Sequence, residues 1–319
     1  MRKATLLLTL LCCLNASSQT TESDVLSVAR KVNDYFMAHY ADPTLPTNVK
    51  KVRPSSLWTR AVYYEGLMSL NAIDSDKRYT DYALRWADFH QWTPRNGINT
   101  CDADDQCCIQ TYLQLLPYTT RNRDELTRPS RDNLLHQMQT PNPKVGDALY
   151  GWWTWIDGKD CYWSRGNGWV YVALIRCMDE LQPNDKFYKE LKKDFLLMSK
   201  GLLKCQREDG FWNPSLVSSN YAMKETSGTA LFVAGMAWGI RHGLLKAKTY
   251  RPVIDKAWEA MVRDAVHHNG FLGWMQGTGK DPSAGQPLSY TKIPDFEDYG
   301  TGCFLLGAVE YYRLLKGDK

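Results

Sequence analysis

The 319-residue sequence lacks an apolar run long enough to cross a bilayer as a helix, which takes about 20 residues. It has only six histidines, all scattered, and its adjacent Cys107 and Cys108 lack the C-x-x-C spacing of a zinc site. Basic and acidic residues are interspersed at a net charge of +4, without a basic stripe or an acidic tail. These absences argue against a metal centre, a nucleic-acid partner and a membrane span.

Residues 1–18 have the features of a secretory signal peptide. A basic start is followed by the short apolar run of residues 4–14 and by small residues at 16–18. We therefore expect an exported protein, periplasmic or extracellular, with a single mature domain over residues 19–319. A lipoprotein anchor at one of the two cysteines of the apolar run is the alternative. The other seven of the nine cysteines have no regular spacing, so we expect free thiols rather than a disulfide framework.

Apolar residues recur with a helical period along most of the mature chain. Strand patterns are few and short, and Pro, Gly, Asn and Asp are concentrated between the helical segments. We predict an all-α protein whose ten helices lie at approximately residues 24–40, 56–72, 79–91, 105–118, 124–139, 167–181, 185–205, 227–245, 250–267 and 299–316.

These helices alternate between two kinds. One kind is amphipathic and charged, such as SDVLSVARKVNDYFMAHY, and is expected to lie outside with one wet face. The other is rich in small and apolar residues, such as SGTALFVAGMAWGI, and is expected to be buried. The alternation predicts a double ring, the (α/α)6-barrel type of toroid, which has six hairpins when it is closed. Ten helices leave this ring one inner and one outer helix short.

Each buried helix begins after a polar or glycine-rich phrase: DADDQC, SRGNGW, KETSGT or DYGTG. The inner helices of an alternating ring run in one direction, so these N-termini are expected to gather at one end of the ring. Free backbone N–H groups and helix dipoles would converge there and favour an anion. The alternative is that each phrase only caps its helix.

Tryptophan is concentrated in residues 152–169, WWTWIDGKDCYWSRGNGW, which hold five of the twelve in the chain. Aromatic faces at the mouth of a cavity stack on the apolar faces of sugars. Trp155, Trp163 and Trp169 do not share one helical stripe, and polar residues lie between them. We assign these three to a substrate site and the first two tryptophans of the segment to packing.

Three aspartates and one arginine are the candidates for chemistry. Asp157 follows Trp155, and a buried carboxylate beside aromatic rings has a raised pKa and can donate a proton near neutral pH. Asp104 and Asp105 open a buried helix, where either a catalytic or a capping role fits. Arg165 lies at the start of an inner helix, where it would pair with the carboxylate of an acidic ligand or form a structural salt bridge.

Together these phrases resemble glycoside hydrolase family 105, the unsaturated rhamnogalacturonyl hydrolases, which is related to the unsaturated glucuronyl hydrolases of family 88. The resemblance covers nearly the whole mature chain and rests on DADDQCCIQTYLQL, WWTWID, CYWSRGNGWVYVAL, KETSGTALFVAGMAWGIRHGLL and DYGTGCFLL, in this order. It implies an (α/α)6 barrel, in agreement with the helix pattern, and it implies neither a metal nor an organic cofactor.

The resemblance also implies a chemistry. Polysaccharide lyases leave a 4,5-unsaturated uronic acid at the non-reducing end of each fragment, and these hydrolases release it by hydrating the C4=C5 double bond. Asp157 matches the family's aspartate that protonates C4 and then, as a base, activates the water that attacks C5. Asp105 matches the second aspartate, with Asp104 as the alternative, and would orient the substrate and keep the pKa of Asp157 high. The family's contacts to the sugar and its carboxylate match Trp155, Trp163, Arg165 and Trp169.

One departure from the family lies between WWTWID and YWSRGNGW. In family members the aspartate of the first phrase begins an inner helix, and that helix, an outer helix and long loops precede the second phrase. Here residues 158–160 join the two phrases almost directly, in agreement with the predicted shortage of two helices. Loss of this pair would expose apolar faces of the neighbouring helices, and each Å² of apolar surface exposed costs about 25 cal/mol of stability. Over many hundreds of Å² this cost would exceed the net stability of a domain, which is about 5–15 kcal/mol. The ring must then close as five hairpins, stay open or be unstable.

Three functions are compatible with the sequence. The first is an active hydrolase of unsaturated uronides from pectin or rhamnogalacturonan fragments. The second is a catalytically impaired relative or a carbohydrate-binding pseudoenzyme, because of the missing hairpin. The third is an ordinary hydrolase of another α/α-barrel family, which would act on saturated sugars. No residue pattern sets the oligomeric state.

Overall fold

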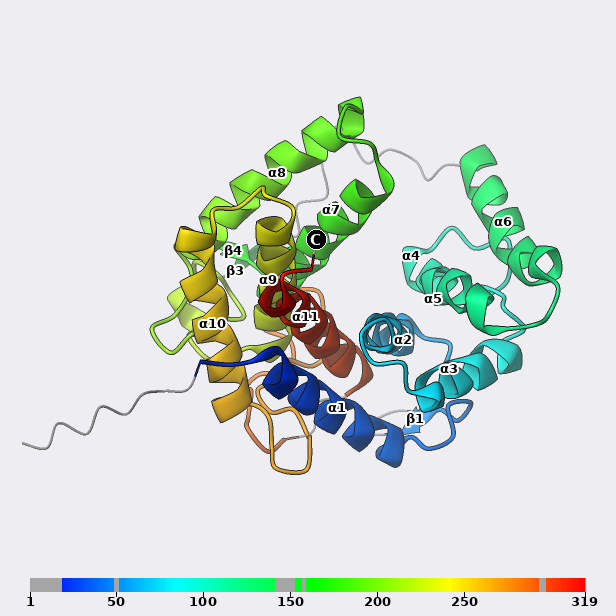
Figure 1. Ribbon diagram of the computed structural model, residues 1–319, viewed down its shortest axis with the longest axis horizontal. Coiled ribbons are helices and arrows are strands. Elements are labelled where there is room, and N and C mark those ends of the chain that lie inside the picture. Colours follow the sequence, from blue (N-terminus) through cyan, green and yellow to red (C-terminus); the bar gives the residue numbers. More distant parts are fainter. Residues whose placement is uncertain (1–18, 49–51, 141–152, 157–158, 293–296, 319) are drawn as a thin grey trace, which may run out of the picture.

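The computed structural model describes residues 19–48, 52–140, 153–156, 159–292 and 297–318 (Figure 1). Of residues 48, 153–156 and 159–161 it describes the backbone alone. Within these ranges the protein is mainly helical, and no helix is both long and apolar enough to cross a membrane.

The described helices form an inner and an outer layer (Figure 1). In the inner layer α11 packs between α2 and α9, α7 packs on α9, and α5 packs on α2. The inner helices are α2 (Trp58–Asn71), α5 (Cys108–Leu115), α7 (Ser164–Glu180), α9 (Thr226–Arg241) and α11 (Asp298–Lys316). The outer helices are α1 (Glu22–His39), α3 (Lys77–Phe89), α6 (Arg123–Gln139), α8 (Lys186–Leu203) and α10 (Ala247–Asp264).

All ten predicted helices are present, and so the predicted toroid of alternating inner and outer helices is confirmed. The predicted helix over 105–118 is divided into three pieces: α4 (Ala103–Gln106), α5 and the short 3₁₀ helix η1 (Leu116–Tyr118). A second 3₁₀ helix, η2 (Ser219–Tyr221), lies between α8 and α9. In the described residues the ring has five inner and five outer helices.

The two layers differ in burial as their sequences predict. In α9 nearly every residue from Thr226 to Gly239 is buried, because neighbouring helices surround it. In α10 the buried residues Tyr250, Ile254, Ala257, Trp258 and Met261 recur every three or four positions, so one face packs inward and the other meets solvent.

Two small antiparallel hairpins complete the described secondary structure. The first pairs β1 (Thr47–Asn48) with β2 (Val52–Arg53). The second pairs β3 (Trp153–Ile156) with β4 (Lys159–Tyr162), with Trp153 opposite Tyr162 and Ile156 opposite Lys159. The first tryptophan-rich phrase thus forms β3. The residues directly before the second phrase form β4, which leads into α7, where the second phrase lies.

Glycines allow the backbones of the inner helices to touch. A Cβ added to Gly302 of α11 would lie 2.2 Å from the carbonyl oxygen of Val62 on α2, and one added to Gly66 would lie 2.6 Å from the Gly302 oxygen. On the other side of α11, a Cβ on Gly307 would lie 2.6 Å from the Ala230 oxygen of α9. Real side-chain carbons do not approach backbone this closely, so α11 depends on glycine at both interfaces.

We predict that Gly302→Ala destabilises the protein by about 1–3 kcal/mol or more, because the added methyl group must push α2 and α11 apart. Gly201→Ala in α8 is the matched control, since a Cβ there meets no atom within 4 Å. It should leave stability unchanged or raise it by up to about 1 kcal/mol. Urea denaturation followed by circular dichroism measures both, and equal stabilities of the two variants would contradict the role given to Gly302.

Candidate active site

The N-terminal ends of four inner helices meet at one end of the ring. Thr59 of α2 donates a hydrogen bond from its hydroxyl to Asp298 of α11 at 3.2 Å. Ser164 at the start of α7 lies so close to Gly228 of α9 that a Cβ there would come within 2.2 Å of its hydroxyl oxygen. The phrases SRGNGW and DYGTG, more than a hundred residues apart, are neighbours too, since the Arg165 guanidinium lies over the Tyr299 ring. The alternation of inner and outer helices predicts this gathering of helix starts.

A continuous strip of aromatic rings and one guanidinium group connects these helix ends. Trp169 of α7 meets Trp58 of α2 edge to face, with ring centroids 6.3 Å apart, and Trp58 lies 5.5 Å from Tyr299 of α11. The guanidinium of Arg165 then lies between two rings, 4.9 Å from the Tyr299 centroid and 4.7 Å from that of Trp163. Trp58 and Trp169 are partly exposed, whereas Trp163, Arg165 and Tyr299 are buried.

Arg165 fixes a loop from the other half of the chain. Its Nη1 and Nη2 atoms donate to the backbone oxygens of Gln276 and Gly277 at 3.1 and 2.8 Å. The indole N–H of Trp163 donates to the Gln276 side chain at 2.8 Å, and the Tyr299 hydroxyl donates to the Gln276 backbone oxygen. This geometry favours a positioning role for Arg165 in the free protein, and its predicted contact with a substrate carboxylate stays a prediction.

The polar phrases act as caps at two of the helix ends. Glu225 is fully buried and accepts hydrogen bonds from the backbone N–H groups of Ser227 and Gly228 at 3.0 and 2.6 Å, at the start of α9. Asp102 accepts from the N–H of Asp104 at 2.9 Å, at the start of α4. Here the donors that an anion would use are already satisfied. The start of α7, by contrast, has no side-chain cap.

Asp104 and Asp105 have different environments. Asp105 is buried, and its carboxylate accepts hydrogen bonds from Arg95, Asn96 and Thr100 at 2.8–3.0 Å, so it holds the loop before α4. Asp104 is exposed, and its carboxylate accepts no hydrogen bond from the described residues. Burial of part of the carboxyl group and the nearby carboxylates of Asp102 and Asp105 raise the pKa of Asp104. Of the two, Asp104 is the one available to a ligand.

Asp157 lies outside the described residues, between β3 and β4. For Trp155 the structure describes only the backbone, which pairs with Asp160. Their assignment to the site therefore stays a prediction. The described residues before and after Asp157 belong to strands β3 and β4, whereas in the family this aspartate is expected to begin a helix.

Sequence reasoning missed two acidic residues at the start of α11. Asp298 is buried beside Arg60, with 3.5 Å between its carboxylate and Nε, and Glu297 accepts from the hydroxyl of Tyr40 at 3.0 Å. Burial raises the pKa of both carboxyl groups, although Arg60 and Tyr40 act in the opposite direction. The pKa of each group is therefore higher in the folded than in the unfolded protein. Stability falls as the pH rises from the unfolded pKa to the folded pKa, because the folded state binds the proton more tightly. The sequence feature that could have identified them is the pair of acidic residues at the start of a predicted inner helix.

Trp58 and Gln276 were also missed. Trp58 is the first residue of an inner helix, like the phrases that the sequence did single out, but it has no glycine-rich neighbour. Gln276 lies in a loop and contributes through its backbone oxygen as well as its side chain, so its residue type carried no signal.

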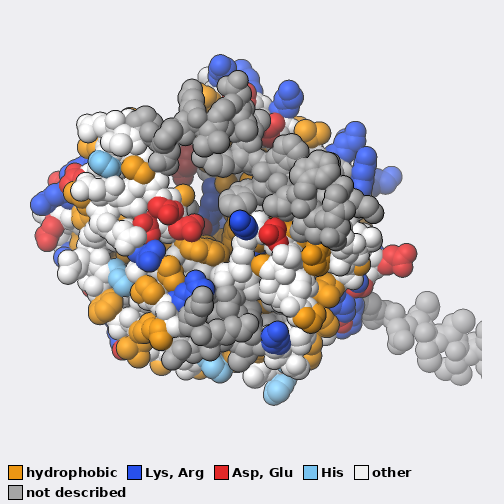
Figure 2. All heavy atoms as spheres, turned by 180° about the vertical axis from the view of Figure 1, so that it is seen from behind, with side chains coloured by type: hydrophobic (Ala, Val, Ile, Leu, Met, Phe, Trp, Pro, Cys, Tyr) orange, Lys and Arg blue, Asp and Glu red, His pale blue; other side chains and the backbone are white. Residues whose placement is uncertain are grey.

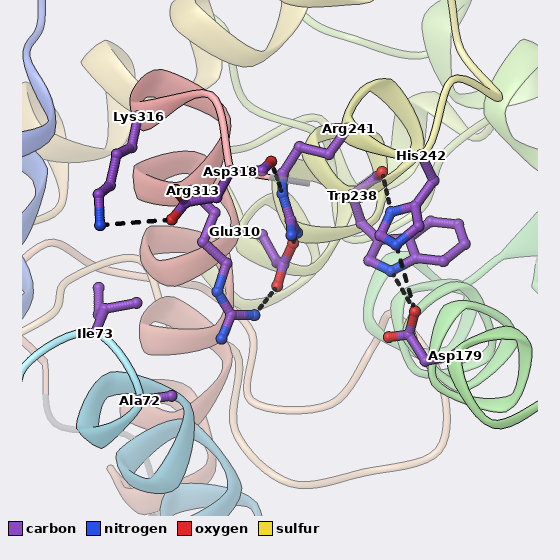
Figure 3. Close-up of a pocket in the computed structure, with 10 residues that line it drawn as sticks. All are labelled: Ala72, Ile73, Asp179, Trp238, Arg241, His242, Glu310, Arg313, Lys316 and Asp318. Atoms are coloured by element: carbon purple, nitrogen blue, oxygen red, sulfur yellow. Dashed lines mark hydrogen bonds and ion pairs between the residues drawn. The ribbon is translucent and has the colours of Figure 1, made fainter.

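A cavity of about 690 Å³ lies at the other end of the ring, where the inner helices end (Figure 3). Figure 3 shows its ionic groups paired with one another: Arg241 and Arg313 both contact Glu310, and His242 and Trp238 both contact Asp179. It is lined by Ala72, Ile73, Asp179, Trp238, Arg241, His242, Glu310, Arg313, Lys316 and Asp318, none of which belongs to the phrases that open the inner helices. We therefore place the candidate active site at the opposite end.

The face seen from behind Figure 1 is hollowed near its middle (Figure 2). Acidic, basic and hydrophobic side chains border this hollow. β3 and β4, which precede α7, lie in the background of Figure 1 and so on the side that Figure 2 shows. The hollow therefore opens on the side of the molecule where α7 begins.

Residues 28–159 and 152–315 match the model of Glycosyl Hydrolase Family 88. The chain therefore belongs to this family, and the kinship with families 105 and 88 that the motifs indicated is confirmed. The two matched segments overlap at residues 152–159, which contain the first tryptophan-rich phrase.

Similar proteins agree with this assignment. Unsaturated 3S-rhamnoglycuronyl hydrolase from Formosa agariphila is 38% identical over 161 residues, which cover 49% of this chain and 40% of the relative. The protein of the same name from Alteromonas sp. is 36% identical over 158 residues, or 48% of this chain and 36% of the relative. The matches thus span less than half of either relative. A glycosyl hydrolase family 88 structure from Bacteroides vulgatus has a TM-score of 0.77 at 26% identity and covers 92% of this chain and 100% of that one.

We predict that Arg165→Lys lowers the free energy of unfolding by about 1.5–3 kcal/mol, because an ammonium group cannot serve both backbone oxygens and still stack between two rings. Arg78→Lys, at an exposed ion pair, should cost less than about 1 kcal/mol. Chemical denaturation measures both without substrate. Full stability of Arg165→Lys would show that Arg165 does not hold the loop and is free to serve the ligand.

Proposed function

We propose that this chain is an unsaturated glycuronyl hydrolase, which removes a 4,5-unsaturated uronic acid from the non-reducing end of an oligosaccharide. The observation that carries the proposal is the strip from Trp169 through Trp58 and Tyr299 to Arg165, at the end where the inner helices begin. Its two partly exposed indoles offer apolar faces to a sugar ring. Family membership supports glycoside chemistry at this place.

In this proposal Asp157 is the acid and the base. It donates its proton to C4 of the unsaturated ring, which leaves an oxocarbenium-like centre at C5. As a carboxylate it then takes a proton from the water whose oxygen bonds to C5. The resulting hemiketal opens by breaking the bond between C5 and the ring oxygen, which leaves a ketone at C5 and a hemiacetal at C1. The hemiacetal collapses to an aldehyde, the bond between C1 and the glycosidic oxygen breaks, and the rest of the oligosaccharide leaves as an alcohol. Asp104, with its solvent-facing carboxylate, orients the sugar, and Asp105 supports the loop beside it.

The sugar beyond the unsaturated ring is proposed to be rhamnose. The motifs resemble rhamnogalacturonyl hydrolases, and the two curated relatives are named for unsaturated 3S-rhamnoglycuronyl substrates. Rhamnose-linked unsaturated uronides of both kinds are therefore the first to test, before glucuronyl fragments. Export by the signal peptide of residues 1–18 would place the enzyme where such fragments are formed or imported.

An impaired relative is the second candidate, and one specific observation favours it. Strands β3 and β4 flank Asp157, and an inner and an outer helix of the expected twelve are missing from the described ring. The division of the family match at residues 152–159 supports an internal loss at this point. A displacement of about 1 Å at a catalytic group can cost roughly a hundredfold in rate.

We expect the purified protein to reduce the ultraviolet absorbance of an unsaturated rhamnogalacturonan disaccharide or an unsaturated 3S-rhamnoglycuronyl oligosaccharide, because hydration removes the conjugated double bond. Asp157→Asn should abolish this loss, since the variant has neither the proton nor the base. Asp194→Asn on the exposed face of α8 is the matched control and should keep full activity.

Two outcomes would contradict the proposal. A folded protein that leaves every unsaturated substrate unchanged would support the impaired relative. Hydrolysis of saturated analogues would support an ordinary glycosidase, because the hydration mechanism cannot act on them. Circular dichroism must first show that each variant is helical.

A second pair of variants separates the two neighbouring aspartates. Asp104→Asn is expected to lower kcat/KM by about 10²-fold or more with little change in stability, because its carboxylate is exposed and accepts no hydrogen bond from described residues. Asp105→Asn should instead cost about 1–3 kcal/mol of stability, because it weakens the bonds to Arg95, Asn96 and Thr100. Steady-state kinetics and urea denaturation measure the two effects, and the reverse pattern would return the substrate role to Asp105.

A further inference from the structure

Asp298 joins the starts of two inner helices. Its carboxylate accepts a hydrogen bond from the Thr59 hydroxyl of α2 at 3.2 Å and lies 3.5 Å from the Nε atom of Arg60 on the same helix. On α11 it accepts a hydrogen bond from the backbone N–H of Tyr299 at 3.0 Å. One buried side chain therefore connects α2 and α11 at the end of the ring where the candidate site lies.

The residues that Asp298 connects stand beside two members of the aromatic strip. Thr59 directly follows Trp58 in α2, and Tyr299 directly follows Asp298 in α11. The Trp58 and Tyr299 rings lie 5.5 Å apart, with an angle of 39° between their planes. A shift of Thr59 relative to Asp298 would therefore change how the two rings meet. It would also turn the partly exposed indole of Trp58 away from its present orientation.

Arg60, the cation that pairs with Asp298, is held from its other side by the N-terminal part of the chain. Its Nη2 atom donates to the Thr47 hydroxyl at 2.9 Å, and its Nη1 atom donates to the Pro43 backbone oxygen at 3.4 Å. The guanidinium also lies over the rings of Phe36 and Tyr40, 5.5 and 5.2 Å from their centroids. The cation thus has little freedom to move, and it fixes the carboxylate beside it.

A stabilising role alone does not account for this buried pair. Two buried charges add little net stability, because the cost of removing them from water offsets their attraction. The glycine contacts at Gly66 and Gly302 already hold α2 against α11 further along the two helices. What Asp298 adds is direction, since hydrogen bonds to a carboxylate fix the orientation of their donors as well as their distance.

Glu297, the residue before Asp298, provides a comparison. It is buried as well, and its carboxylate accepts hydrogen bonds from the hydroxyl of Tyr35 in α1 at 3.4 Å and from that of Tyr40, directly after α1, at 3.0 Å. These contacts connect the start of α11 to an outer helix, whereas those of Asp298 connect it to the helix that carries Trp58. Two neighbouring buried carboxylates therefore hold α11 to different partners.

We propose that Asp298 is a positioning residue, which fixes the Trp58 indole in the orientation that stacks on a sugar ring of the substrate. The inference rests on the proposed function, because it takes the aromatic strip as the surface that binds the sugar. Stacking on an indole stabilises the bound substrate and the transition state alike. Loss of the positioning therefore weakens binding and leaves the rate of the chemical step unchanged.

Fluorine NMR of the purified protein labelled with fluorotryptophan tests the position of Trp58 without a reaction. The Trp58 signal is identified by its loss in Trp58→Phe. We expect Thr59→Val and Asp298→Asn each to shift, split or broaden this signal, because the first removes the hydrogen bond between the helices and the second removes the charge that pairs with Arg60. Thr59→Val keeps the ion pair, so it decides alone if Asp298→Asn fails to fold.

Two controls show whether the effect is local. The signal of Trp258, which packs 5.4 Å from Phe304 of α11, should stay unchanged in both variants, because α11 itself keeps its place. Tyr40→Phe is the matched control variant. Like Thr59→Val it removes one hydroxyl from the start of α11, but this hydroxyl donates to Glu297, and the Trp58 signal should not change.

Calorimetric titration with an unsaturated rhamnogalacturonan disaccharide, in protein that carries Asp157→Asn, measures binding without turnover. We expect Thr59→Val to weaken binding about three- to tenfold, the loss that corresponds to one hydrogen bond. Thr59→Ser keeps the hydroxyl and should restore the affinity, and Tyr40→Phe should bind as tightly as the parent. In protein with Asp157 intact, Thr59→Val should raise KM by the same factor and leave kcat unchanged.

The inference is overturned if the Trp58 signal is the same in Thr59→Val as in the parent, because Asp298 then does not set the position of the indole. It is also overturned if the signal changes while the affinity does not, or if the disaccharide does not bind at all. A parent protein that binds the disaccharide and does not hydrolyse it contradicts the proposed reaction alone. The expected changes in signal and affinity would still support the role of Asp298.

Discussion

The close approach of α11 to its two neighbours is the constraint on which the rest of this structure depends. Gly302 brings its backbone against Val62 of α2, and Gly307 brings it against Ala230 of α9. Helices that touch through glycine have little freedom to slide, because neighbouring side chains interlock once the backbones are in contact. The starts of α2, α9 and α11 are thereby held together, and α7 joins them through Gly168 and Gly228.

This arrangement explains why the aromatic strip is continuous. Trp58, Tyr299 and Trp169 lie within the first two turns of three helices. The glycine contacts further along these helices fix their positions relative to one another. Arg165 then connects the strip to the loop at Gln276, and buried hydrogen bonds to a charged group are expected to hold that loop firmly. The site is thus built from residues as far apart as Trp58 and Tyr299, which the packing of the inner helices brings together.

Helix positions were predictable from the sequence because burial in a double ring follows a local pattern. The charged face of α10 indicates an outer helix, and the continuous apolar run of α9 indicates an inner one. The division of the segment at 103–118 was not predictable, since it arises where Asp105 turns back to Arg95 and Thr100. Contacts of this kind depend on the path of the loop before the helix, and the amino-acid composition does not predict that path.

The site was predictable in part. Motifs placed Trp163, Trp169 and Arg165 together, but they did not show that Arg165 is buried between rings, because its partners Gln276 and Tyr299 lie more than a hundred residues further along. The choice between caps and an anion site could not be made from the phrases either. It depends on whether a side chain such as Glu225 reaches its own helix N-terminus, and this one does.

Arg176 connects the two sides of the candidate site, because it lies on α7 and reaches both α5 and α2. Asp104 lies in α4, directly before α5, and Trp169 lies in α7, and Arg176 of α7 donates a hydrogen bond to Gln110 of α5. In a closed toroid an intervening helix would set this spacing by packing. Here Arg176 of α7 connects to α5 through its hydrogen bond to Gln110 and to α2 through its ion pair with Glu65, which is partly open to solvent. A salt bridge of this kind fixes position less strictly than packed helices, because it tolerates rotation and is weakened by salt. The relative placement of the Asp104 carboxylate and the Trp169 indole therefore depends in part on Arg176.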